Sequence, residues 1–159
     1  MNSSIPMLRR SCTPSAMKVA AALLLALSCC GSFAALEDAP SDVPAARVQR
    51  TEATTSAGVA YTDISRTLKS GTVVHEFVDA SGAVFAVTWS GPFKPDLKRL
   101  LGRHFGALGE GGKPRGSRAP VDVKSDDVVV QSGGHMGAFE GRAWLVSKLP
   151  AGFDTQEMK

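Results

Sequence analysis

The chain has 159 residues, with 18 Lys and Arg against 15 Asp and Glu. At about 100 to 200 residues per domain, this length excludes a multidomain enzyme and fits one domain with terminal appendages. The sequence specifies neither a reaction nor a ligand, but it predicts a destination and an architecture.

The N-terminal segment has the order of a secretory signal peptide. Basic residues precede the unbroken apolar run Val19–Leu27, and mostly small residues follow as far as Ala34. This charged, apolar and small-residue order is typical of export, and the run is too short for a membrane-spanning helix of about 20 residues. We expect residues 1–34 to be a signal peptide cleaved near Ala34, and the protein to be periplasmic or secreted.

Removal of this segment changes the composition. It contains every cysteine and three of the cations: Cys12, Cys29, Cys30, Arg9, Arg10 and Lys18. The processed chain then has 15 basic and 15 acidic side chains and no thiol. We therefore expect no disulfide, thiolate metal ligand or nucleic-acid partner. Translation could start at Met1 or at Met17.

The processed chain divides into three parts. Residues 35–60 are rich in Ala, Thr, Ser and Pro without a periodic apolar face, which predicts a flexible leader. A single α+β domain is expected over residues 61–153. Residues 154–159 are expected to be a C-terminal tail.

The domain begins with three runs typical of strands: Tyr61–Leu68, Thr72–Val78 and Ala83–Ser90. They are rich in Val, Thr, Phe and Trp, and Ser-Gly occurs at each break. Residues 79–82 predict a type I turn whose last residue, Gly82, is left-handed. Residues 70 and 71 predict a two-residue turn.

This turn geometry predicts a register. Val78 lies near Val84, and the other expected pairs are Phe77 with Phe85, His75 with Val87, and Val73 with Trp89. The same alternation gathers the apolar side chains on one face. That face comprises Val73, Phe77, Phe85, Val87, Trp89, Ile64 and Leu68.

A helix is expected to follow. Pro95 and Asp96 suit its first turn, and Gly106 suits its end. Apolar residues recur between them at helical spacing, which predicts one buried stripe across the sheet: Leu97, Leu100, Leu101 and Phe105. His104, near the expected end, is predicted to favour its cationic form.

Three later segments complete the sheet: Val121–Lys124, Val128–Ser132 and Arg142–Val146. Together the elements predict an α+β domain, an antiparallel sheet of five or six strands with one helix packed on it. Asp126 and Asp127 fall in an expected turn, where adjacent acids face water.

Two blocks carry a family resemblance, GTVVHEFVDASGAVFAVTWSGPFKPDLKRLLGRHF and VVVQSGGHMGAFEGRAWLVSKLPAGF. They resemble a family of small exported proteobacterial proteins classed as a domain of unknown function, and the resemblance covers Tyr61–Phe153. It implies a signal peptide and no assigned activity. No catalytic residue can be transferred from it.

The glycine-rich block SGGHMGAFEGRAW has the most unusual local composition. In one interpretation its glycines admit a ligand, with His135 and Glu140 beside it and Arg142 as an anion clamp. In the other, which we favour, it is a tight turn and bulge in which Met136 and Phe139 cap the core.

Other segments carry weaker signals. His75 and Glu76 begin like a zinc-protease motif, but a strand sends them to opposite sides, so we expect no metal and a solvent-facing Glu76. The loop GALGEGGKPRG departs from a phosphate-binding loop at Ala107 and Pro114. Its cations could contact an anionic partner: Lys113, Arg115 and Arg118.

These observations favour a non-enzymatic binding or structural module of the bacterial cell envelope, without a cofactor and with an envelope protein or polymer as its partner. The alternative is a small metal-dependent or hydrolytic enzyme that uses His75, His135 and Glu140. That enzyme requires the three side chains to converge.

Overall fold

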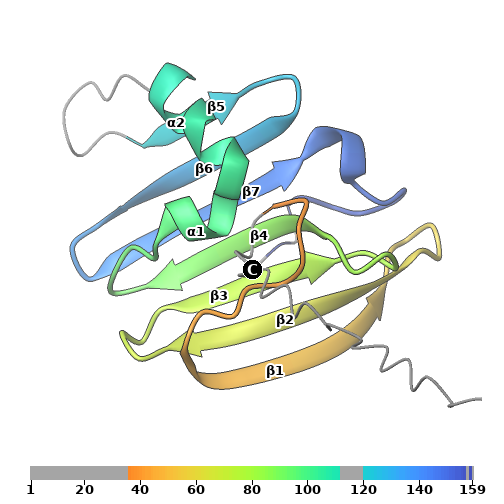
Figure 1. Cartoon of the computed structure of the whole chain (residues 1–159), viewed down its shortest axis with the longest axis horizontal. Helices are drawn as coiled ribbons and strands as arrows, with labels where there is room; N and C mark the ends of the chain where they lie inside the picture. Colours follow the sequence, from red (N-terminus) through yellow and green to blue (C-terminus); the bar gives the residue numbers. More distant parts are fainter. Residues whose placement is uncertain (1–35, 112–119, 157, 159) are drawn as a thin grey trace, which may run out of the picture. The chain divides into compact units, whose positions relative to one another are not determined.

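The computed structural model describes residues 36–111, 120–156 and 158. They form one seven-stranded antiparallel sheet with a helical segment on one face, which confirms the predicted α+β class (Figure 1). The order across the sheet is β1-β2-β3-β4-β7-β6-β5. The strand bounds are β1 (Ala45–Thr54), β2 (Ala60–Leu68), β3 (Val73–Val78), β4 (Val84–Gly91), β5 (Val121–Lys124), β6 (Val128–His135) and β7 (Ala138–Leu145).

Strand β1 corrects the prediction of a flexible leader. It pairs with β2 along its whole length, from Ala45 opposite Leu68 to Thr54 opposite Ala60. Most of its side chains are exposed on both faces, so the strand is held by backbone pairing rather than by an apolar face. A prediction based on hydrophobic periodicity therefore has no signal to find there.

Residues 36–44 form a strap that crosses the sheet on the side of the helix (Figure 1). Leu36 is fully buried, and its N–H donates to the carbonyl of Leu100 at 3.1 Å. The N–H of Glu37 donates to the carbonyl of Val84 at 2.7 Å. The folded domain thus begins well before residue 61, where the sequence placed its start.

The C-terminal residues also belong to the fold instead of forming a tail. Met158 is only 9% exposed and packs with Phe77, Phe85 and Ala86. The carbonyl of Thr155 accepts a hydrogen bond from the sheet. A single methionine separated from the preceding strand by loops gives no periodic pattern.

The β3–β4 hairpin has the predicted turn but a different register. Gly82 has φ +87° and its N–H donates to the carbonyl of Asp79 at 3.0 Å. Val78 lies opposite Val84 as expected, but Phe77 lies opposite Ala86, so Phe85 is an extra residue in a bulge.

The bulge separates the residues that were expected on one face. His75 lies opposite Thr88, and Val74, not Val73, lies opposite Trp89. Val87 and Trp89 belong to one core cluster, whereas Phe77 and Phe85 belong to another. The β2–β3 turn differs as well, because the N–H of Leu68 donates to the carbonyl of Thr72 and closes a three-residue loop.

The two clusters lie on opposite faces of the sheet. The helix face carries the larger one, which includes Ile64, Val74, Val87, Trp89 and Leu101. The other side, called here the open face, carries an aromatic cluster of Tyr61, Phe77, Phe85 and Phe153. In that cluster the Phe85 and Phe153 ring centroids are 4.9 Å apart.

The helical segment links β4 to β5 in three pieces: α1 (Leu97–Leu101), η1 (Gly102–Phe105) and α2 (Gly106–Gly111). The helix opens where predicted, but Asp96 is its N-cap rather than a first-turn residue, since its Oδ1 accepts from the N–H groups of Lys98 and Arg99. Gly106 continues the segment rather than ending it, and Phe105 is 38% exposed rather than buried. In the part of the chain that the structure describes, no helix is long and apolar enough to cross a bilayer.

Candidate ligand-binding groove

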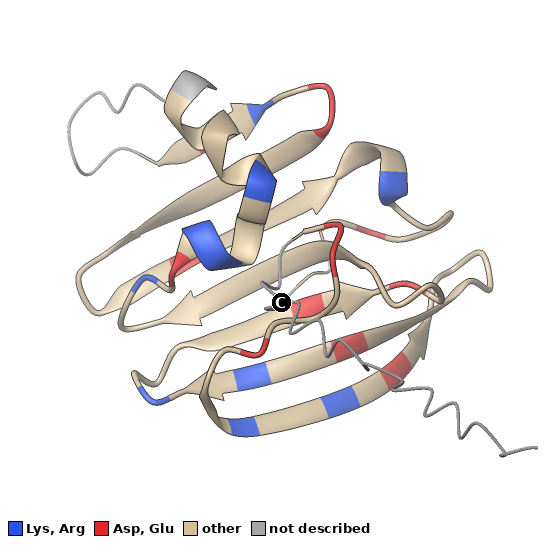
Figure 2. Cartoon of the chain, in the orientation of Figure 1, with Lys and Arg blue, Asp and Glu red and all other residues tan. Residues whose placement is uncertain are grey.

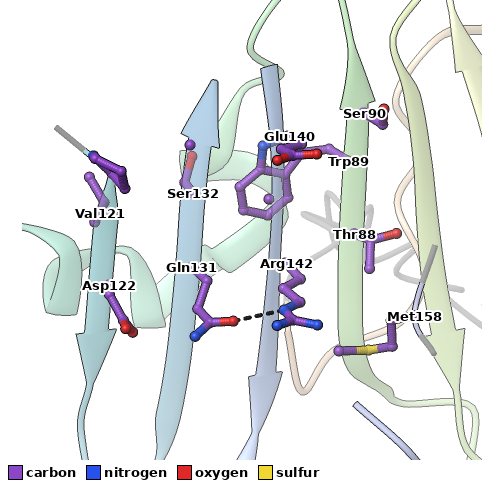
Figure 3. A pocket seen from close by; sticks show the side chains of 13 residues that line it. Thr88, Trp89, Ser90, Val121, Asp122, Gln131, Ser132, Glu140, Arg142 and Met158 are labelled. Atoms are coloured by element: carbon purple, nitrogen blue, oxygen red, sulfur yellow. Dashed lines mark hydrogen bonds between the residues drawn. The ribbon is translucent and has the colours of Figure 1, made fainter. Parts of the chain in front are cut away.

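A row of polar side chains crosses the open face of four neighbouring strands. The strand register places Thr88 on β4 opposite Arg142 on β7, Arg142 opposite Gln131 on β6, and Gln131 opposite Asp122 on β5. One step along, Ser90 lies opposite Glu140. Figure 3 shows these side chains around a groove of about 610 Å³.

Two glycines shape the strands under the groove. A Cβ at Gly141 would lie 2.2 Å from Cζ2 of Trp89, so glycine at this position makes room for the indole that packs on the helix face. A Cβ at Gly133 would meet no atom within 4 Å. The absence of a side chain there leaves space beside Glu140.

Arg142 is the best-fixed side chain in the groove. Its Nε donates to Oε1 of Gln131 at 2.7 Å, its Nη1 to the carbonyl of Thr155 at 2.9 Å, and its Nη2 to Oε1 of Gln156 at 3.3 Å. The guanidinium carbon also lies 5.7 Å from the ring centroid of Trp144. Arg142 is half-buried, and within the described residues it has no ion-pair partner.

The glycine-rich block is a tight β6–β7 hairpin, as one of the two interpretations predicted. Gly134 and Gly137 have φ of +105° and +90°, conformations that glycine adopts readily. Met136 does not cap the core, because it stands in the turn and is 90% exposed.

The three candidate residues of this block are only partly brought together. Glu140 and Arg142 both line the groove. His135 ends β6 and lines a neighbouring hollow of about 400 Å³, which Glu140 and Ser90 also line. Its Nδ1 lies 3.0 Å from the carbonyl oxygen of Met136, so His135 is a hairpin residue at the margin of the site.

His75 and Glu76 point to opposite faces, as the strand pattern predicted. His75 lies on the open face, with its Nδ1 2.9 Å from Oδ1 of Asp63. The expectation of a solvent-facing Glu76 is wrong, because Glu76 is only 2% exposed. It accepts from Nε of Arg66 at 2.9 Å and from the N–H of Ser41 at 3.0 Å, which places a compensated charge under the strap.

The residues of the alternative enzyme hypothesis do not converge. Three strand spacings and four residues separate His75 from His135 in the observed register, which corresponds to roughly 20 Å. The same geometry places His75 roughly 12 Å from Glu140. No three metal-ligating side chains cluster within residues 36–111, 120–156 and 158.

Several predicted features lie outside the described residues. They are the signal peptide and the three loop cations Lys113, Arg115 and Arg118. Conversely, sequence reasoning missed Thr88, Asp122 and Gln131 as groove residues. The alternation of each strand could have indicated their face, but only the pairing of β7 with both β4 and β6 joins them to Arg142.

The groove offers fixed charge and hydrogen-bonding groups rather than a set of reacting groups. Arg142 can bind an anion, and Ser90, Gln131 and Glu140 can bond polar groups next to it. Glu140 lies two residues along β7 from Arg142, and Asp122 lies two strands away on β5. Negative charge therefore borders the groove in two directions, and the site suits an isolated anionic group better than a continuous polyanion.

The described domain coincides with a recognised sequence family. Residues 32–158 match the family described as "Protein of unknown function (DUF2844)". This range includes the strap and β1 as well as the two blocks on which the resemblance was based. Comparisons with curated proteins and with solved structures find no match. The chain therefore belongs to the DUF2844 family, whose members are proteins of unknown function.

Proposed function

We propose that the protein is an exported, non-enzymatic binding module of the bacterial cell envelope whose ligand occupies the groove on the open face. The observation that supports this proposal is the hydrogen bonding and burial of Arg142. Its guanidinium is fixed by three neutral acceptors and is half-buried in a hollow.

A partly buried charge is stabilised when an opposite charge reaches it. The three neutral acceptors orient the guanidinium without neutralising it, and two of its five N–H groups have no acceptor among the described residues. A carboxylate or phosphate group of an envelope polymer or protein has the required charge and geometry. The ligand class we propose is therefore a polar molecule with a single anionic group at the Arg142 position.

The amino-acid sequence supports the export half of the proposal. The segment up to Ala34 has signal-peptide order, and the remainder is charge-neutral and free of cysteine. A domain without disulfides depends on its hydrophobic clusters outside the cytoplasm, and this chain has one on each face of its sheet.

Binding can be tested with a matched pair of small ligands. The purified processed protein is titrated with galacturonate, which bears one carboxylate, and with its neutral methyl ester, while ¹H–¹⁵N spectra are recorded. We expect shifts at the Nε–H of Arg142 and at the amides of Gln131 and Glu140 with the charged sugar only. Arg142→Gln should weaken this binding roughly tenfold or more.

The matched control is Arg47→Gln, which removes the same charge from exposed strand β1. Urea unfolding of both variants checks that Arg142→Gln keeps its C-terminal segment in place. Equal binding by Arg142→Gln and the parent chain, or shifts that map away from the groove, would contradict the site. A pull-down from envelope extract that recovers nothing above background would count against the binding function.

Export has a separate test. Cells that express the full chain are fractionated, and the N-terminus of the recovered protein is sequenced. We expect a periplasmic or secreted protein that begins at Ala35. Protein that remains in the cytoplasm with its first 34 residues would refute this part of the proposal while leaving the groove unaffected.

A further inference from the structure

The outer edge of β1 is the least protected part of the described sheet. β1 has ten residues, of which most are exposed on both faces, and it pairs only with β2. The opposite edge strand, β5, has four residues, and helix α2 packs beside it. One edge of the sheet is therefore short and packed against a helix, whereas the other is long and exposed.

A long open edge presents a row of unpaired backbone N–H and C=O groups that can pair with another strand. Proteins usually blunt such an edge with proline, a bulge, a very short strand or charged side chains that repel a partner strand. β1 contains no proline, and its irregularity lies at its start, between Ala45 and Arg47. Residues from Arg47 to Thr54 thus form a regular ladder whose outer side is unpaired within the described residues.

The charges along β1 fit a second copy of the same strand. Figure 2 shows that basic and acidic residues both occur along this strand. Two antiparallel copies related by a two-fold axis pair residues whose numbers have an even sum, because paired residues must present the same side of the backbone. An axis at Thr51 then places Arg50 of each copy opposite Glu52 of the other, whereas an axis at Arg50 would bring two arginines together.

Neither charge faces a charged residue on the neighbouring strand β2. Across the sheet, Arg50 lies opposite Ile64 and Glu52 opposite Thr62. Within the described residues neither side chain forms an ion pair. The same register places Gln49 opposite Ala53 and Val48 opposite Thr54, so it uses most of the strand and covers Val48, which is 47% exposed.

We propose that two copies of this chain associate through antiparallel pairing of their β1 strands, centred on Thr51, with reciprocal Arg50–Glu52 contacts. Pairing would join the two sheets into one continuous sheet. The two-fold axis makes the contact isologous, so association stops at the dimer. The groove on β4, β7, β6 and β5 lies on the other half of each sheet and stays open in this dimer.

Charge reversal tests both the dimer and its register. The protein is expressed as the full 159-residue chain, purified as the cells process it, and examined by sedimentation velocity over a hundredfold concentration range. We expect a concentration-dependent dimer. Arg50→Glu and Glu52→Arg should each raise the dimer dissociation constant roughly tenfold, since two attractive cross-strand pairs become repulsive.

Two rescue experiments distinguish the loss of a contact between the two copies from damage to the fold. The double variant Arg50→Glu/Glu52→Arg should dimerise like the parent, and an equimolar mixture of the two single variants should form heterodimers, because both cross-strand pairs are again of opposite sign. Arg47→Glu is the matched control, since this register places Arg47 opposite Thr55, and it should change the dissociation constant less than threefold.

A protein that sediments as a monomer at every concentration would overturn the proposal. A dimer that ignores both single reversals, or single variants that do not recover on mixing, would also overturn it. Capture of β1 by a strand of a different protein, with no self-association, would equally exclude a second copy as the occupant.

Discussion

The two faces of the sheet differ in whether a buried charge has a partner of opposite charge. On the helix face, Glu76 lies under the strap and is matched by the guanidinium of Arg66 and the N–H of Ser41. On the open face, Arg142 is held only by neutral oxygen atoms within the described residues. The first arrangement completes a charge pair within the fold, and the second leaves the opposite charge to come from outside.

The two faces also differ in the segments that pack over them. The strap and the helical segment lie over the helix face, where the largest apolar cluster is found. On the open face, the described C-terminal residues pack on the aromatic cluster and contact Arg142, with Met158 at the border of the groove. One face of the sheet is thus covered by the strap and the helical segment, whereas the other carries the groove.

The largest effect is expected from the Arg66–Glu76 pair. Glu76→Ala removes one partner of a buried ion pair, leaves Arg66 uncompensated and releases the Ser41 N–H. We expect a loss of about 3–5 kcal/mol in the free energy of unfolding. Urea denaturation measures this loss directly.

Glu140→Ala is the control on the open face. It removes the same carboxylate from an exposed position, and its effect should stay within about 0.5 kcal/mol. If the two variants were equally stable, the contrast between the faces would disappear.

Much of the fold was predictable because its elements carry local signals. Strands β2, β3 and β4 follow from β-rich runs between Ser-Gly breaks, and Asp96 marks the start of the helix. β1 and the strap were missed because they carry no such local signal. One is a polar edge strand, and the other depends mainly on the single buried residue Leu36.

The register and the site required long-range pairing. The bulge at Phe85 cannot be read from an alternating apolar run, and it moved Phe77 to the opposite face from the one predicted. Glu140 and Arg142 were identified from local composition. Gln131 and Asp122 became groove residues only when β6 and β5 were placed beside β7.

The glycines of the groove strands give the next largest effect. Gly141→Ala would place Cβ 2.2 Å from the Trp89 ring and 2.7 Å from the carbonyl of Gln131. Overpacking of this kind costs up to about 3 kcal/mol, and urea unfolding should show it.

Gly133→Ala faces open space instead and should be neutral or slightly stabilising, since alanine is favoured over glycine in a strand by up to about 1 kcal/mol. A destabilisation of Gly133→Ala as large as that of Gly141→Ala would show that the groove side of the sheet is filled.

A smaller effect is expected at the C-terminus. Met158→Ala removes a side chain that packs with Phe77, Phe85 and Ala86. A loss of about 2 kcal/mol is expected, at the low end for a core methionine because the site borders the groove. Thermal unfolding measures the loss, and Met136→Ala, in the exposed hairpin turn, should have no effect. A Met158→Ala variant as stable as the parent chain would show that this methionine does not anchor the C-terminal segment.

The smallest effect concerns pH. Burial lowers the pKa of His104 from its usual 6.5, the nearby Arg103 charge lowers it further, and Asp127 and Asp38 only partly oppose this shift. The cationic imidazole expected from the sequence is therefore disfavoured, because the helical segment continues past Gly106 and the ring is mostly covered.

Its contribution to stability has a definite sign. As the pH falls below about 6.5, the unfolded chain takes up a proton that native His104 resists, so the native state loses stability until the pH passes the native pKa. Urea unfolding of His104→Gln between pH 7.5 and 5 should show a shallower decline than the parent chain. Identical slopes would mean that the environment of His104, where Oε2 of Glu37 lies 3.4 Å from Nε2, accommodates the charged ring. The contrast between the two faces would then depend on Glu76 and Arg142 alone.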